Sequence, residues 1–150
     1  MEHTTVRRLP RAGIDTIDDP DTALAAIAMA ITRPFRSETI LLLLDETRRG
    51  RAIVVVSGTT EPDQAIEVVE CITQGTEHIG AIVVASIRPG AEDHRDHRPD
   101  DHHDERAGDV DRWLEMSDIA SLVGIELIEW FVIGRTISCP RDQLGEAPRW

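Results

Sequence analysis

The side chains with the clearest chemical potential lie between residues 86 and 109. Four of the six histidines are there, at His94, His97, His102 and His103. Imidazoles in flexible tracts bind zinc, nickel or copper weakly. The stretch is also densely acidic and almost without apolar residues, which favours a mobile loop over residues 88–107. We therefore expect weak metal binding at most by these four histidines, because a mobile loop lacks the fixed surroundings of a catalytic site.

Two polar residues close the apolar strand that precedes this loop. Ser86 is expected to be a hydrogen-bonded strand end, and Arg88 a solvated or ion-paired residue at the rim. Asp109 follows the loop and is expected to begin a helix, where a carboxylate accepts backbone N–H groups. Two alternatives remain open: Arg88 could hold an anionic ligand, or Arg88 and Asp109 could form an ion pair with each other.

The elements that would position these residues follow from hydrophobic patterning. Short apolar runs at 40–44, 52–58, 79–86 and 125–134 predict buried strands, and 135–140 a short fifth. Helices are expected from Asp19 to Pro34, over 62–75, and from about 108 to 123. In the first, the spacing of Leu24, Ile27, Ala28 and Ile31 predicts one buried face. The order indicates an α/β sandwich, like three layers, with a mixed sheet of about five strands and three helices.

The composition sets limits on the class of protein. The chain of 150 residues suits one domain, expected over 18–140, with a flexible lead-in over 1–17 and an extended tail over 141–150. The net charge of −12 disfavours nucleic acid and anionic lipid. Apolar runs are too short to span a bilayer. The first residues also lack the apolar middle of a secretion signal, so we expect a cytoplasmic protein. Cys71 and Cys139 match no metal or redox spacing, so we expect reduced thiols, with Cys71 in the core.

Three stretches resemble the RadC-like JAB domain, a relative of the JAMM metalloproteases. They are "ILLLLDETRRGRAIVVVSGT", "AIVVASIRPG" and "LVGIELIEWFVIG", and the resemblance covers residues 38 to about 140. It implies the JAB fold, which is similar to that of cytidine deaminases. It also implies where a zinc site would lie: at the end of the third strand, on a carboxylate of the second strand, and at a Ser-x-x-Asp opening the next helix.

The positions that match this zinc site hold Ser57, Ser86, Arg88 and Asp109. Only Asp109 keeps the residue type of the family. Serine is a poor zinc ligand at neutral pH, and arginine has no free lone pair and brings a fixed positive charge. Zinc hydrolases need about three protein ligands and an open position. The resemblance therefore implies the scaffold while these residues argue against the activity. Trp130, nearby, is expected to fill space beneath the former site.

These observations favour a non-catalytic RadC-like protein that serves as a binding or interaction module. No cofactor is expected, although zinc is not excluded. One alternative is a metal-dependent hydrolase or peptidase with ligands rebuilt from the histidine-rich loop. Another is a regulator that binds an anion or small molecule at Ser86 and Arg88. The partner would be a protein or a small molecule of unknown identity, and a homo-oligomer is open. The lost ligands argue against an enzyme without deciding the question.

Overall fold

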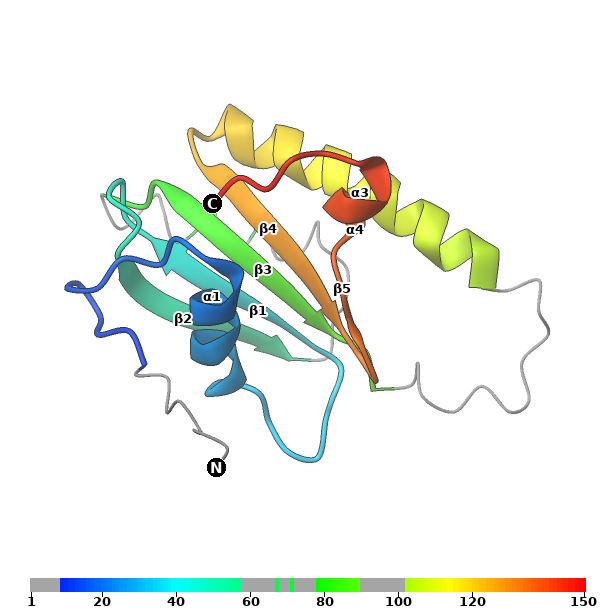
Figure 1. Ribbon diagram of the computed structural model, residues 1–150, viewed down its shortest axis with the longest axis horizontal. Helices are drawn as coiled ribbons and strands as arrows, with labels where there is room; N and C mark the ends of the chain where they lie inside the picture. Colours follow the sequence, from blue (N-terminus) through cyan, green and yellow to red (C-terminus); the bar gives the residue numbers. More distant parts are fainter. Residues whose placement is uncertain (1–8, 58–66, 68–70, 72–77, 90–101) are drawn as a thin grey trace, which may run out of the picture.

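The computed structural model describes residues 9–57, 67, 71, 78–89 and 102–150, with side chains from residue 108 onward in the last range. The elements run in the order α1 (Pro20–Ala28), β1 (Glu38–Leu44), β2 (Gly50–Ser57), β3 (Ala81–Ile87), α3 (His102–Leu122), β4 (Glu126–Ile133), β5 (Ile137–Ser138) and α4 (Pro140–Leu144). The described part is thus an α/β fold with five strands and three helices, as expected (Figure 1).

The five strands form one mixed sheet in the order β2-β1-β3-β4-β5. β1 pairs antiparallel with β2 and β3, β3 pairs parallel with β4, and β5 closes the far edge antiparallel to β4. A parallel pair needs a crossover connection, and α3 lies in that connection. The register aligns Glu38, Ile87 and Ile133 across three strands, so the carboxyl ends of β3 and β4 lie at the same edge as the start of β1.

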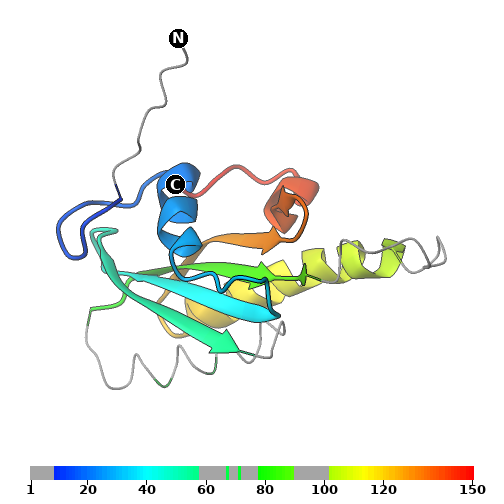
Figure 2. The ribbon, with the colours of Figure 1, turned by 90° about the horizontal axis from the view of Figure 1, so that it is seen from below.

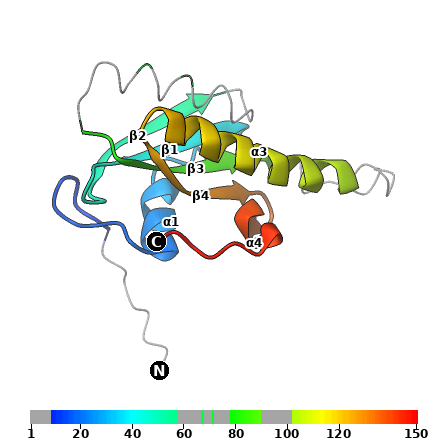
Figure 3. The same ribbon diagram turned by 90° about the horizontal axis from the view of Figure 1, so that it is seen from above.

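Helices cover both faces of the sheet, with α1 on one and α3 on the other (Figures 2 and 3). β1 and β3 are buried along their whole length, as their unbroken apolar runs predict. Alternate side chains of these strands enter two cores. The α1-side core includes Ile27, Ile40, Leu42, Val83 and Phe131. The α3-side core includes Leu41, Val84, Trp113, Met116 and Trp130.

α1 begins as predicted and ends earlier than predicted. Asp19 caps it by accepting the backbone N–H of Thr22 at 2.8 Å, and Pro20 occupies the first turn. The helix stops at Ala28, where Met29 bonds back to the carbonyl of Ala26 in a tighter i to i−3 turn. The predicted inward face was partly wrong, because Ala28 is exposed while Ala23 and Ala26 are buried.

β2 is a strand, as predicted, and forms a hairpin with β1, but the prediction that it is buried was wrong. None of its eight residues is fully buried, and Ile53 and Val55 are 39% and 40% exposed. β2 is the outermost strand of the sheet, which leaves it a strand neighbour on one side only. β-branched residues favour any strand, so the run Ile53–Val56 indicated a strand without indicating its place in the sheet.

α3 begins at His102, within the stretch predicted to be a loop up to residue 107. The intervening sequence "DERA" contains good helix formers, and acidic residues stabilise the first turns of a helix through its dipole. From residue 108 onward, the buried side chains of α3 are those of Trp113, Met116 and Ala120, together with Asp109. Leu122, in the last turn of α3, is 85% exposed.

The two ends of the described chain dock on the sheet. Gly13 and Ile17 donate backbone hydrogen bonds to the carbonyls of Gly50 and Arg48, and Ile17 is buried, although residues 1–17 were expected to be a loose lead-in. The predicted extended tail begins instead with the short helix α4, which has Pro140 in its first turn and ends at Gly145 in the left-handed conformation that glycine favours.

The helix predicted over 62–75 falls almost wholly outside the described residues. Glu67 and Cys71 are described, and both are helical. Cys71 is exposed, so the prediction that it lies in the core was wrong. No helix in the part of the chain that the structure describes is long and apolar enough to cross a membrane.

Candidate functional site at the end of β3

Ser86 and Arg88 lie at the carboxyl end of β3, where the backbone is held by hydrogen bonds to β4. The N–H of Arg88 donates to the carbonyl of Ile133 at 2.8 Å, which extends the parallel ladder one residue beyond β3. Residues two apart in a strand share a face. The side chains of Ser86 and Arg88 therefore both lie on the face covered by α3, where Asp109 is found.

Arg88 and Asp109 form a two-point ion pair. Nη1 of Arg88 donates to Oδ2 of Asp109 at 2.8 Å, and Nη2 donates to Oδ1 at 2.9 Å. The side chains are only 19% and 9% exposed, so the pair is largely shielded from water. Two parallel charge-assisted bonds fix both position and orientation. The ion pair that the sequence left as an alternative is thus confirmed.

Trp130 completes the network from β4. Its indole Nε1 donates to Oγ of Ser86 at 2.9 Å, and both side chains are fully buried. The guanidinium carbon of Arg88 lies 5.8 Å from the centre of the Trp130 ring, within the range of a cation–π interaction. Ser86 is therefore the hydrogen-bonded strand end that was expected, and Trp130 fills the space beneath the site.

Asp109 does not begin a helix, and that prediction was wrong. α3 already runs from His102, so Asp109 lies about two turns inside it. Its carboxylate is buried and pairs with Arg88, whereas a helix-start residue would accept backbone N–H groups at an exposed end. The helix that was expected to begin at Asp109 instead carries this carboxylate on the face that packs against the sheet.

The four positions do not fit a zinc ion. Both oxygens of Asp109 accept from Arg88, and Oγ of Ser86 accepts from Trp130. Arg88 offers no lone pair, and its fixed charge repels a dication. Ser57 is exposed at the end of β2 and is separated from β3 by β1, roughly 10 Å in all at ordinary strand spacing. The structure therefore brings three of the four positions together and leaves Ser57 apart.

Weak metal binding by the histidine-rich stretch stays a prediction. His94 and His97 lie outside the described residues, and His102 and His103 are described only as backbone within α3. Among the residues with described side chains, no group of three or more histidines, cysteines or acids could hold a metal ion. His78, which lies outside this stretch, is exposed.

Glu38 is a buried acid at the same edge of the sheet that sequence reasoning missed. Its side chain is on the face opposite Ser86, because Thr39 is the β1 residue in register with Ser86. Oε1 accepts from the hydroxyl of Thr32 at 3.0 Å, while Oε2 has no partner among the described residues. The signal was an acid at the start of a strand that is apolar from Ile40 onward.

A second ion pair, also missed, is more deeply buried. Nε of Arg141 in α4 donates to Oε2 of Glu129 in β4 at 2.9 Å, and the side chains are 7% and 2% exposed. Arg141 also donates to the carbonyl of Glu146 at 2.6 Å. Burial raises the pKa of the neighbouring Cys139 thiol to about 12, and the Glu129 carboxylate acts in the same direction. This thiol is therefore protonated and a poor nucleophile at neutral pH.

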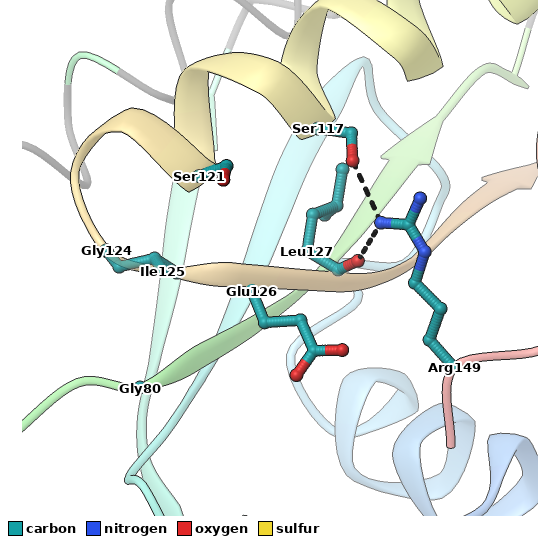
Figure 4. A pocket seen from close by; sticks show the side chains of 8 residues that line it. All are labelled: Gly80, Ser117, Ser121, Gly124, Ile125, Glu126, Leu127 and Arg149. Atoms are coloured by element: carbon teal, nitrogen blue, oxygen red, sulfur yellow. Dashed lines mark hydrogen bonds between the residues drawn. The ribbon is translucent and has the colours of Figure 1, made fainter.

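A hollow of about 340 Å³ lies at the opposite end of the sheet, beside the start of β4 (Figure 4). Arg149 of the tail reaches into it and donates to Oγ of Ser117 at 2.8 Å and to the carbonyl of Leu127 at 2.9 Å. Its guanidinium also stacks 4.7 Å from the centre of the Trp113 ring. These contacts use Arg149 to hold the tail on β4 and α3, so we assign this hollow a structural role.

Comparison with known proteins yields no family for this chain. No protein-family model matches it, and no curated protein matches it.

Proposed function

We propose that this chain is a non-catalytic protein of the RadC-like JAB fold that works as a binding or interaction module. The observation that carries the proposal is the two-point ion pair between Arg88 and Asp109. In the resemblance drawn from the sequence, these positions belong to a zinc site. A guanidinium supplies the positive charge there in place of the metal. Folds persist after their chemistry is lost, so a retained scaffold is compatible with a binding role.

The same ion pair counts against the alternative in which Arg88 holds an anionic ligand. Both terminal nitrogens of Arg88 already donate to Asp109, and the pair is largely buried. A ligand carboxylate or phosphate would have to displace Asp109 and leave its charge unpaired, which is costly away from water. The hydrolase with ligands rebuilt from the histidine-rich loop has no support among the described residues. We infer a cytoplasmic protein, consistent with the unpaired Cys71 and Cys139.

Metal analysis of protein purified without chelators tests the proposal. We expect zinc far below one ion per chain, and no sharp rise in melting temperature when zinc is added, because ligand binding to the native state would raise it. The control replaces the four loop histidines, His94, His97, His102 and His103, by Gln to remove adventitious binding. Stoichiometric zinc that survives in this variant would overturn the proposal.

A further inference from the structure

β2 lies at the outer edge of the sheet, and none of its eight residues is fully buried (Figure 1). β2 is the terminal strand of the sheet, and from Arg51 to Ser57 its backbone pairs with β1 alone among the described residues. Natural sheets protect such edges with proline, clustered charge or short length. β2 has eight residues, no proline and only one charged residue, Arg51. It is therefore suited to accept a further strand.

The chain itself shows how such a strand would be accepted. The N-terminal segment runs antiparallel along the first residues of the hairpin edge, with a bridge between Thr16 and Arg49. Gly13 donates to the carbonyl of Gly50 at 2.8 Å, and Ile17 donates to that of Arg48 at 2.7 Å. These bonds end at Gly50. A second extended segment could continue the same line along the rest of β2.

An apolar groove lies on the α1 side of this edge. Its volume is about 300 Å³, and its apolar lining includes Ala26, Leu42 and Ile53. α1 packs on β1 and leaves Ile53 and Val55 of β2 at 39% and 40% exposed. A strand added to β2 would lay alternate side chains beside these two residues, because cross-strand neighbours share a face.

The charged side chains that line this groove are both arginines, Arg11 and Arg51, and no acid lines it. The chain as a whole carries 28 acids and a net charge of −12, so the charged residues that line the groove are opposite in sign to the net charge of the protein. Nε of Arg11 lies 3.0 Å from Oδ2 of Asp15, and Nε of Arg51 lies 3.3 Å from Oδ2 of Asp45. Both arginine side chains remain 51% exposed, and exposed ion pairs of this kind are weak, so both guanidinium groups can also attract an anionic partner. Complementary charge steers association and selects partners. The groove therefore favours an acidic segment.

We propose that the outer edge of β2 binds an extended peptide segment of a partner protein, in which apolar residues alternate with acidic ones. Main-chain hydrogen bonds along β2 would supply affinity, and the apolar groove with its two arginines would supply selectivity. A second copy of this chain fits less well, because two copies of net charge −12 repel each other. The inference rests on the proposed function only in treating the chain as a binding module.

Fluorescence anisotropy with an eight-residue peptide that alternates valine and glutamate tests the inference. We expect saturable binding by the full chain, and binding about tenfold weaker for a peptide that alternates valine and lysine. Arg51→Glu should reverse this preference. Arg135→Glu is the matched control, since it makes the same charge change at an exposed turn far from β2 in the sheet order. Circular dichroism would verify that each variant folds.

Three outcomes would overturn the inference: no saturable binding of the acidic peptide, an unchanged preference in Arg51→Glu, or an equal change in Arg135→Glu. Concentration-dependent dimerisation that Arg51→Glu abolishes would also overturn it, in favour of a second copy at this edge. The zinc content of the protein tests the proposed function separately, because peptide binding at β2 does not involve Arg88 or Asp109.

Discussion

Two buried arginine–carboxylate pairs flank the parallel strands of this protein, and they differ in how they are held. The Glu129–Arg141 pair joins β4 to α4, with exposures of 2% and 7%, and backbone groups supply further contacts to both partners. The Arg88–Asp109 pair joins the end of β3 to α3, with exposures of 19% and 9%, and its contacts are almost wholly between side chains.

The two pairs therefore differ in what the loss of one partner would do to the fold. A charge pair that is buried on all sides and tied to the backbone cannot lose a partner without leaving an uncompensated charge in the core. A pair near the rim, held mainly by its own two bonds, can be exchanged for another occupant of similar charge balance. We therefore assign fold maintenance to Glu129 and Arg141. Arg88 and Asp109 form the pair that the proposed function interprets as the replacement of a metal site.

The largest effect should come from breaking the deeper pair. Glu129→Gln leaves the Arg141 guanidinium buried without its counter-charge, so we expect a loss of about 3–5 kcal/mol in the free energy of unfolding. Urea denaturation followed by circular dichroism measures this. Asp142→Asn serves as the control, because Oδ1 of Asp142 lies 3.7 Å from Nη1 of the same arginine while the Asp142 side chain is 80% exposed. Equal losses in both variants would contradict the assignment.

A smaller loss of stability is expected when the Arg88–Asp109 pair is broken. Arg88→Met removes two charge-assisted bonds and leaves Asp109 partly exposed to water, so we expect a loss of about 1–3 kcal/mol. The double variant Arg88→Met with Asp109→Leu should recover most of that loss, since no unpaired charge remains. The same denaturation experiment provides the double-mutant cycle. A double variant less stable than Arg88→Met alone would show that the pair holds α3 in place by more than charge balance.

A third carboxylate, Asp45 in the turn between β1 and β2, accepts hydrogen bonds from two backbone N–H groups, those of Thr47 and Arg49. The pKa of Asp45 is lowered to about 2, chiefly by the hydrogen bond from the backbone N–H of Arg49, with Thr47 adding to it. A lowered pKa stabilises the fold above the unfolded value, near 3.9, and this contribution is lost as the pH falls toward 2. Asp45→Asn should therefore destabilise the protein at pH 7 and reduce the loss of stability between about pH 4 and 2. Denaturant midpoints across this range would measure the change, and an unchanged pH dependence would contradict the stabilising role of the ionised Asp45 carboxylate.

The sequence predicted those features that depend on short runs of residues. The unbroken apolar runs of β1 and β3 gave buried strands, and Asp19 followed by Pro20 gave a helix start. The Arg88–Asp109 pair could be predicted as an alternative because the family resemblance places these two residues, 21 positions apart in sequence, at the same site.

Other features depend on tertiary arrangement and could not be read from such runs. The exposed position of β2 follows from sheet order, which β-branched composition does not encode. The Glu129–Arg141 pair forms only because β5 and α4 fold back onto β4. No local sequence pattern predicts that tertiary contact. Glu38 was passed over for a related reason, since its burial depends on Thr32 and on the strands on either side.

The most direct test of the account is the zinc content of the native protein beside that of a variant in which histidines replace Ser86 and Arg88. We predict that the native chain retains almost no zinc, and that Ser86→His with Arg88→His, which frees Asp109 as a ligand, retains about one ion per chain. Adding Asp109→Asn to that variant should abolish retention. A native chain that holds one zinc ion, and loses it on Asp109→Asn, would contradict the claim that an arginine has taken the place of the metal.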